Sequence, residues 1–353
     1  MKIIHCADLH FDSKLETNLS RQKALMRRKE LITSFENMVR YAQKNGVEAV
    51  IVAGDMFDKN KVTEATVSTV SGIIASAKDV DFLVLSGNHD SSNPFETLSA
   101  LPQNLLFFSE EWKSYDYDNV TVAGICINEK NVTSYAPSLS LDLDRFNIVV
   151  LHGDVQNDIN LPALRGKNID YLALGHIHQN SEGKLDERGS FAYSGCLESR
   201  GFDESGVKGF YLLDTDNKTK TFVTECAVRT MFEIEVDITG LSQYFEIKNA
   251  LDNAIGDLGV KDGDMVKAVL VGSFDMDANK DVNQLAAYLE SRFFFSKVKD
   301  QSRALIRAED YKNDLSLKGE FVRQTLASDL SDEEKEEIIL LGIRAIRGEE
   351  IEL

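Results

Sequence analysis

Short apolar runs alternate with amphipathic stretches over roughly the first 225 residues of the chain. Runs rich in Val, Ile and Leu that end beside Gly, Asp or Asn are typical of buried strands. We therefore predict strands at 2–8, 49–55, 82–88, 120–125, 146–153, 171–176 and 209–216. Between the first two, apolar residues recur at helical spacing over 29–46, and Gly46 is a helix-stop signal. This strand–helix–strand order predicts an α/β domain with a largely parallel sheet.

The pattern changes near residue 229, where a smaller α+β unit is predicted to begin. Its expected strands are 231–240, 265–274 and 296–306, and its expected helices are 244–259 and 281–293. The chain then becomes polar and forms an acidic helix at 331–348, with Ser331 as the N-cap. The predicted domains are therefore 1–228, 229–308 and 309–353.

The last predicted helix has apolar residues at Ile338, Leu341 and Ile346. Two interpretations of this stripe stay open. It packs on the helix's own domain, or it docks a partner protein.

Polar residues recur where the predicted strands end. The runs finish in "AGD", "SGN", "LHG" and "LGH". In open α/β sheets ligands bind at the carboxyl ends of the strands, and glycine lets the backbone turn and approach a ligand closely. The sequence therefore predicts one polar rim that carries the function.

Charge narrows the set of expected partners. The 353 residues include 39 basic and 58 acidic side chains, a formal net charge of −19. This balance argues against a generic nucleic-acid binder, because that class presents a basic surface. Bound divalent cations would offset part of the charge, and the segment 21–30 concentrates five basic residues. That segment is either a solvated helix face or a surface that faces DNA.

The sequence also indicates where in the cell the protein is expected to be. It has no run of 18 apolar residues, and its first residues lack the apolar segment of a signal peptide. The four cysteines are scattered without a C-x-x-C pair, which indicates buried free thiols rather than disulfides or a thiolate zinc site. We expect a cytoplasmic protein that does not associate with a membrane.

Residues of metal-ligand type follow the predicted strands in five groups. The groups are Asp8 with His10, Asp55 with Asp58, Asn88 with His89 and Asp90, His152, and His176 with His178. Carboxylates, imidazoles and one amide, without thiolates, suit divalent Mn, Fe or Zn. Because His-x-His serves two adjacent ions more easily than one, we predict that His176 and His178 bind different metals. A carboxylate must then bridge the pair, and Asp55 is the predicted bridge.

The five groups match a known order of motifs. D-x-H, G-D-x-x-D, G-N-H-D, a lone H and G-H-x-H resemble the calcineurin-like metallophosphoesterase superfamily over about residues 1–225. The resemblance implies a four-layer α/β/β/α sandwich, followed here by a small α+β capping domain and a C-terminal helix. The layout of the whole chain is similar to the bacterial SbcD nucleases. "HCADLHFDS" looks most like the YhaO-type branch of bacterial DNA repair exonucleases.

The resemblance implies a role for each matching residue. The first of two metals would be held by Asp8, His10, Asp55 and His178, and the second by Asp55, Asn88, His152 and His176. His89 would be the catalytic histidine, donating a proton to the leaving oxygen or stabilising charge on the phosphate. Asp90 would orient His89.

Four further residues near these motifs have expected roles. His5 is predicted to pack within its strand. Asp58 stands where some relatives have a histidine that touches phosphate, and we expect it to be structural or to support a ligand. Arg200 and Glu198 are expected to line the site.

These expectations combine into a two-metal phosphodiesterase. By resemblance it is a manganese-dependent DNA exonuclease or endonuclease of DNA repair, acting on double-stranded ends or single strands, with iron or zinc as other metals. The small domain would select duplex ends, and the acidic C-terminal region would bind an SbcC-like coiled-coil ATPase. A homodimer is a further expectation.

Two other functions stay open. One is hydrolysis of a nucleotide or cyclic nucleotide, which the acidic charge favours. The other is a catalytically silent scaffold for a partner ATPase, although such proteins usually lose metal ligands and this chain retains them all.

Overall fold

The computed structural model describes residues 1–15, 19–58, 62–87, 94–275, 278–305, 308–346 and 348. Two compact units make up the chain, Met1–Met231 (unit 1) and Phe232–Leu353 (unit 2). The division falls three residues beyond the predicted start of the α+β unit.

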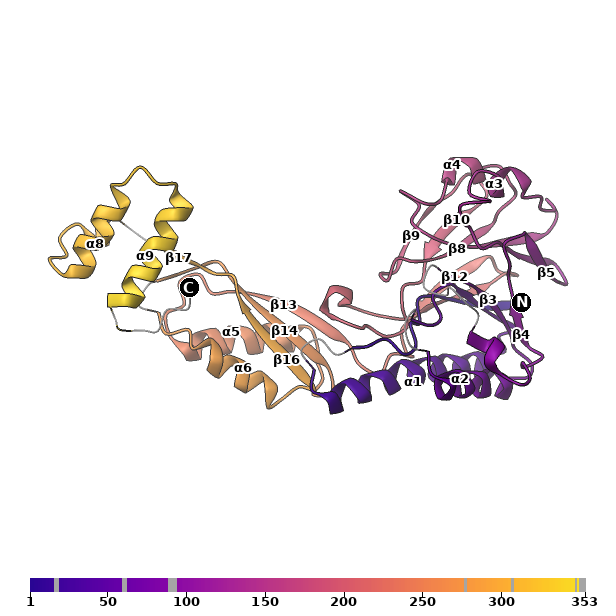
Figure 1. Ribbon diagram of the computed structural model, residues 1–353, viewed down its shortest axis with the longest axis horizontal. Coiled ribbons are helices and arrows are strands. Elements are labelled where there is room, and N and C mark those ends of the chain that lie inside the picture. The colour runs from indigo at the N-terminus through magenta and orange to yellow at the C-terminus, as the bar shows by residue number, and fades with distance from the viewer. Residues whose placement is uncertain are drawn as a thin grey trace. The chain divides into compact units, whose positions relative to one another are not determined.

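Unit 1 contains two sheets, and each has a parallel centre (Figure 1). The first has the order β12-β11-β1-β2-β3-β4, in which β1 to β4 are parallel and β11 and β12 add antiparallel pairing. Its strands are β1 Lys2–Cys6, β2 Ala49–Ala53, β3 Asp81–Leu85, β4 Leu105–Phe107, β11 Phe210–Asp214 and β12 Thr219–Val223. The predicted parallel arrangement is therefore confirmed for its centre.

The second sheet has the order β5-β6-β7-β8-β10-β9. Strands β6, β7, β8 and β10 are parallel, and β5 and β9 form antiparallel edges. The bounds are β5 Lys113–Tyr117, β6 Val120–Gly124, β7 Phe146–His152, β8 Tyr171–Gly175, β9 Ser181–Lys184 and β10 Ser190–Tyr193. The edge strands β5 and β9 are largely exposed and have no continuous apolar run, so the pattern did not predict them.

Alternating side chains divide unit 1 into layers. On β1, Ile3 belongs to the core between the two sheets, whereas Ile4 packs in the core beneath the helices. Helices α1 Arg21–Asn45 and α2 Glu64–Ser76 cover the first sheet, and the short helices α3 Tyr135–Ser138 and α4 Leu161–Leu164 cover the second. Single-turn helices η1 Pro94–Thr97 and η2 Phe202–Glu204 complete the unit. The expected four-layer α/β/β/α sandwich is confirmed.

Helix α1 begins eight residues before the predicted helix. Ser20 caps it by accepting a hydrogen bond from the Lys23 N–H, and Gly46 ends it with a φ of 66°. The basic segment 21–30 therefore lies on this helix. It is not simply a solvated face, because Arg27 is only 1% exposed.

Unit 2 packs helices on a small sheet. Strands β13 Met231–Asp237, β14 Met265–Val271 and β16 Phe295–Asp300 form one sheet, and β15 Ser273–Asp275 pairs with β17 Arg303–Leu305. The helices are α5 Tyr244–Asp257, α6 Val282–Glu290, α7 Ala308–Tyr311, α8 Leu317–Leu326 and α9 Asp332–Ile346. One apolar core joins side chains of α5, α6, α8 and α9.

Helix α9 packs on its own unit, but not through the predicted stripe. Ile339 and Ile343 lie in the core with Val322 of α8. Ile338 and Ile346 are 37% and 40% exposed. Ile338 and Ile346 therefore do not show the first interpretation, packing on the helix's own domain, because the core takes the neighbouring Ile339 and Ile343 instead. Docking of a partner by the stripe stays a prediction.

No described helix is long and apolar enough to cross a membrane. The four cysteines are free, and all except Cys126 are buried.

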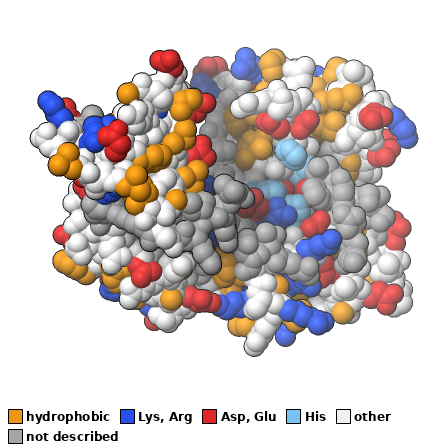
Figure 2. All heavy atoms as spheres, turned by 60° about the vertical axis from the view of Figure 1, so that its left-hand side comes forward, with side chains coloured by type: hydrophobic (Ala, Val, Ile, Leu, Met, Phe, Trp, Pro, Cys, Tyr) orange, Lys and Arg blue, Asp and Glu red, His pale blue; other side chains and the backbone are white. Residues whose placement is uncertain are grey.

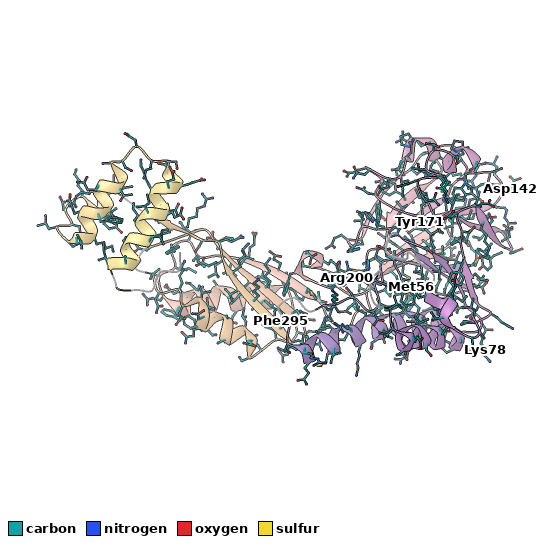
Figure 3. All side chains as sticks on the ribbon, in the orientation of Figure 1. Met56, Lys78, Asp142, Tyr171, Arg200 and Phe295 are labelled. Atoms are coloured by element: carbon teal, nitrogen blue, oxygen red, sulfur yellow. The ribbon has the colours of Figure 1, made fainter. Side chains whose placement is uncertain are left out.

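His5 connects the two sheets of unit 1. It is fully buried on β1, as predicted. Its Nδ1 accepts a hydrogen bond from the Tyr171 hydroxyl at 2.8 Å, and its Nε2–H donates to the Leu174 carbonyl at 3.2 Å. Both partners lie on β8 of the other sheet, and Tyr171 is labelled in Figure 3. Burial lowers the pKa of His5 to about 3, although the bond to Leu174 opposes the shift.

We predict that His5 makes unit 1 sensitive to mild acid. The folded pKa of about 3 lies below the unfolded value of 6.5, so the unfolded state takes up the proton first and stability falls as pH drops below 6.5. Between pH 7 and pH 5 this group should cost about 2 kcal/mol of unfolding free energy. The double variant His5→Phe/Tyr171→Phe should show a shallower decline by that amount in urea unfolding with EDTA. Equal declines in the two proteins would contradict the assignment.

Candidate metal centre

Six of the predicted ligands converge where strands of the two sheets end. Figure 2 shows histidine side chains in a recess of the surface, with acidic and basic side chains beside them. The first sheet supplies Asp8, His10 and Asp55 after β1 and β2, and the second supplies His152, His176 and His178 from β7 and after β8. Asn88, His89 and Asp90 lie outside the described residues.

The backbone after β1 and β2 keeps the two loops together. The N–H of Asp8 donates to the Gly54 carbonyl at 3.1 Å, and the N–H of His10 donates to the Asp55 carbonyl at 3.0 Å. Asp8, His10 and Asp55 have φ values of 53°, 44° and 51°. Residues other than glycine rarely adopt this left-handed region, and such strain clusters at functional sites. The turns aim both carboxylates at the same place.

The donor atoms form two adjoining groups. Asp8, His10 and His178 offer atoms within 4.8 Å of one another, and so do Asp8, Asp55 and His152. The Nε2 atoms of His10 and His178 are 3.2 Å apart. Asp55 Oδ2 lies 3.8 Å from His10 Nε2 and 3.4 Å from His152 Nε2. Asp55 therefore reaches one histidine of each expected metal, and Asp8 also contributes to both groups.

His176 lies beside the second group. Its N–H donates to both carboxylate oxygens of Asp8 at 3.0 Å. Its ring meets that of His152 edge to face, with centroids 5.4 Å apart. His176 and His178 thus face different histidines, because His178 pairs with His10.

Hydrogen bonds on the outer side of two rings fix their tautomers. The His152 Nδ1–H donates to the Ala53 carbonyl at 2.9 Å. His178 Nδ1 lies 2.7 Å from Glu204 Oε1, and its hydrogen donates to that carboxylate. Both Nε2 lone pairs then face the other donor atoms, the form in which imidazole binds a metal. Oxygen and imidazole donors without thiolate fit hard to borderline divalent ions.

Glycines at the strand ends let the backbone lie directly against the side chains of the site. A Cβ on Gly54 would lie 2.1 Å from His152 Nδ1, and one on Gly87 would lie 2.1 Å from Asp55 Oδ1. A Cβ on Gly175 would lie 1.9 Å from the Ala53 carbonyl oxygen. These clashes explain why glycine stands beside the polar residue at the end of these strands.

Burial and mutual charge shift protonation in the cluster. Burial raises the pKa of Asp8 to about 6, although the nearby histidines oppose the shift. Burial lowers the pKa of His152, but the hydrogen bond to Asp55 and the charges of Asp8 and Asp55 outweigh it and raise the pKa to about 9. Protons and cations compete for the same atoms, so a bound divalent ion displaces protons.

We predict that metal binding strengthens as pH rises. His152 keeps a proton up to about pH 9, and Asp8 keeps one up to about pH 6. The affinity of EDTA-stripped protein for Mn²⁺ should therefore rise about tenfold per pH unit between pH 6 and pH 8. Calorimetry in two buffers of different ionisation enthalpy should report between one and two protons released at pH 6.5. Binding without proton release, at an affinity independent of pH, would contradict this.

Three charged residues of the segment after β10, Glu198, Arg200 and Glu204, lie at different distances from the site. Arg200 lies at the site, as expected, with Nη2 2.9 Å from His178 Nδ1. Glu198 does not line it, because its carboxylate accepts hydrogen bonds from Arg27 and Ser34 of α1. Glu204 was missed, since it follows no strand and only the fold brings it to His178.

A sandwich of two mostly parallel sheets, with adjoining carboxylate and imidazole donors at the strand ends, is the fold and site of a metallophosphoesterase. The chain belongs to the calcineurin-like phosphoesterase family, which residues 1–180 match. Members of this family are metal-dependent phosphoester hydrolases that use two divalent metal ions.

Individual proteins similar to this chain include one metallophosphoesterase and several DNA repair proteins, all at about a quarter sequence identity. The chain is 26% identical over 298 residues to the uncharacterised metallophosphoesterase YhaO of Bacillus subtilis (strain 168), covering 77% of this chain and 72% of YhaO. It is 25% identical over 254 residues to the DNA double-strand break repair protein Mre11 of Methanopyrus kandleri, covering 61% of this chain and 54% of that protein. Mre11 of Saccharolobus solfataricus is 26% identical over 240 residues, covering 61% and 60%. The chain thus spans little more than half of these Mre11 proteins.

Among solved structures, a novel archaeal phosphodiesterase shares 14% identity over 63% of this chain and 99% of its own, with a TM-score of 0.38. A likeness of this size carries no argument about activity.

Proposed function

We propose that this protein is a two-metal phosphodiesterase that cleaves DNA, with Mn²⁺ as its metal. The observation that carries the proposal is the pair of adjoining donor groups, with Asp55 Oδ2 within 4 Å of a histidine from each. Two divalent ions bound by these groups would hold a phosphate between them and supply a water activated for in-line attack.

Each chain residue has a role in this proposal. Asp8, His10, Asp55 and His178 hold one ion, and Asp55, Asn88, His152 and His176 hold the other. His89 donates a proton to the departing sugar oxygen or stabilises charge on the phosphate. Asp90 orients the His89 ring, and the bond from His152 Nδ1–H to Ala53 turns His152 Nε2 toward Asp55 and the proposed metal.

DNA is the proposed substrate because six archaeal relatives are named as DNA double-strand break repair proteins. In this proposal residues 229–308 select DNA ends, and 309–353 dock a coiled-coil ATPase. Leu315, two residues before α8, and Leu317, its first residue, are 96% and 72% exposed, as a docking surface requires.

The net charge of −19 favours a second candidate, hydrolysis of a nucleotide or cyclic nucleotide. A small substrate carries few charges and is repelled less by an acidic protein than a long polyanion is.

We predict that end-labelled duplex DNA is degraded when Mn²⁺ is present and is intact with EDTA. Cyclic AMP and bis-p-nitrophenyl phosphate, assayed at the same protein concentration, separate the candidates. Rapid turnover of cyclic AMP with intact DNA would support the second candidate instead.

We predict that two variants separate metal binding from catalysis. Asp55→Ala should lower the occupancy of both metals, because it removes the shared ligand. His89→Ala should retain both ions and lose at least about a hundredfold in turnover, the usual size of a general-acid contribution. Elemental analysis after gel filtration measures occupancy, and the exposed-site variant Glu182→Ala is the control. Two ions bound to Asp55→Ala would refute its bridging role.

A further inference from the structure

The ring of His178 is hydrogen-bonded to a residue that is not itself one of the proposed metal ligands. Its Nδ1 lies 2.7 Å from Glu204 Oε1, on the side of the ring opposite to Nε2. Glu204 is 5% exposed and comes from the single turn η2. Burying a carboxylate costs free energy unless charges or hydrogen bonds compensate it, so the other partners of Glu204 need to be identified.

Arg200 is the partner that keeps Glu204 ionised. Its Nε and Nη2 donate to Glu204 Oε1 at 3.0 and 2.6 Å, and its backbone N–H donates to Oε2 at 2.8 Å. An ionised carboxylate only accepts, so it selects the His178 tautomer with hydrogen on Nδ1. Arg200 Nη2 also approaches Nδ1, but that nitrogen cannot accept while its hydrogen points at Glu204.

The backbone of His178 is fixed as well. The buried Lys208 donates from Nζ to the His178 carbonyl at 2.9 Å, and the Cys196 N–H approaches the same oxygen at 3.4 Å. The ring and the main chain of His178 are thus both held by residues of the segment 196–208.

That segment is anchored on helix α1. The Ser199 hydroxyl donates to the Glu204 carbonyl at 2.8 Å, and the Ser199 carbonyl accepts from Arg27 Nη2 at 2.6 Å. Arg27 also pairs with Glu30 and Glu198. Figure 3 labels Arg200 on the side of unit 1 away from the N-terminus that Figure 1 marks. Glu204 therefore rests on a rigid support rather than on a mobile loop.

We propose that Glu204, held by Arg200, is a positioning residue that orients His178 and fixes its tautomer for one of the two metals. The inference rests on the proposed metal pair. It assigns to this chain a carboxylate–imidazole–metal arrangement in which Glu204 holds hydrogen on Nδ1 and leaves Nε2 as the metal-binding nitrogen. The second metal, with His152, depends instead on the Ala53 carbonyl.

The test compares Glu204→Gln with Asp203→Asn, which removes a charge from the exposed neighbour in the same turn. Calorimetric titration with Mn²⁺ should show two sites in the wild type and in Asp203→Asn. In Glu204→Gln one site should weaken by roughly 10- to 100-fold and the other should be unchanged. Equal affinities of both sites in Glu204→Gln would overturn the inference.

A second measurement reads the tautomer in the wild type itself. Nitrogen-15 NMR of histidine-labelled, metal-free protein reports which ring nitrogen carries hydrogen, and His178→Asn assigns the signal. We expect hydrogen on Nδ1 of His178 in the wild type, and hydrogen on Nε2 would overturn the inference. A wild type that binds fewer than two ions yet shows the Nδ1 tautomer would count against the proposed function alone.

Discussion

The burial of two carboxylates among imidazoles, at the ends of parallel strands, is the constraint on which the rest of unit 1 depends. Asp8 and Asp55 are each 1% exposed. Removing a carboxylate from water is costly unless charges and hydrogen bonds replace the water. The His176 N–H donates to Asp8, while left-handed turns and close glycines bring the two carboxylates together. Strained backbone of this kind clusters at functional sites, which indicates that the carboxylate oxygens bind a ligand. Divalent ions are the ligands that this donor set suits.

The centre exists only because the two sheets face each other. Each sheet contributes three of the six described candidate ligands, so neither sheet alone offers the donor atoms for a metal pair. His152 of β7 bonds to Ala53 of β2 across the gap, and His5 of β1 bonds to Tyr171 of β8. A histidine between the sheets is thus a candidate ligand at the rim, as His152 is, and a neutral structural group deeper in the core, as His5 is. Distance from the strand ends decides which role it takes.

Two buried arginine–glutamate clusters support the centre at different depths. Arg27 with Glu198 joins α1 to the segment after β10, and Glu198 also accepts from the backbone N–H groups of Val228 and Arg229. Arg200 with Glu204 then carries this support to His178. The ordered polar contacts make the site rigid, because a buried ion pair tolerates few alternative arrangements.

The sequence by itself predicted the parallel strands and the rim on which six described candidate ligands come together, because apolar runs that end in Asp or His follow local rules of strand burial and rim placement. It could not place Glu204 or the buried Arg27, since a charged residue outside any apolar run looks the same whether it faces water or a buried partner. The rotation of α9 was also beyond it, because Ile338 and Ile339 are adjacent and only packing selects the inner one. Which carboxylates and cations meet was decided by the tertiary structure, through contacts between residues as far apart in the sequence as Glu30 and Arg229.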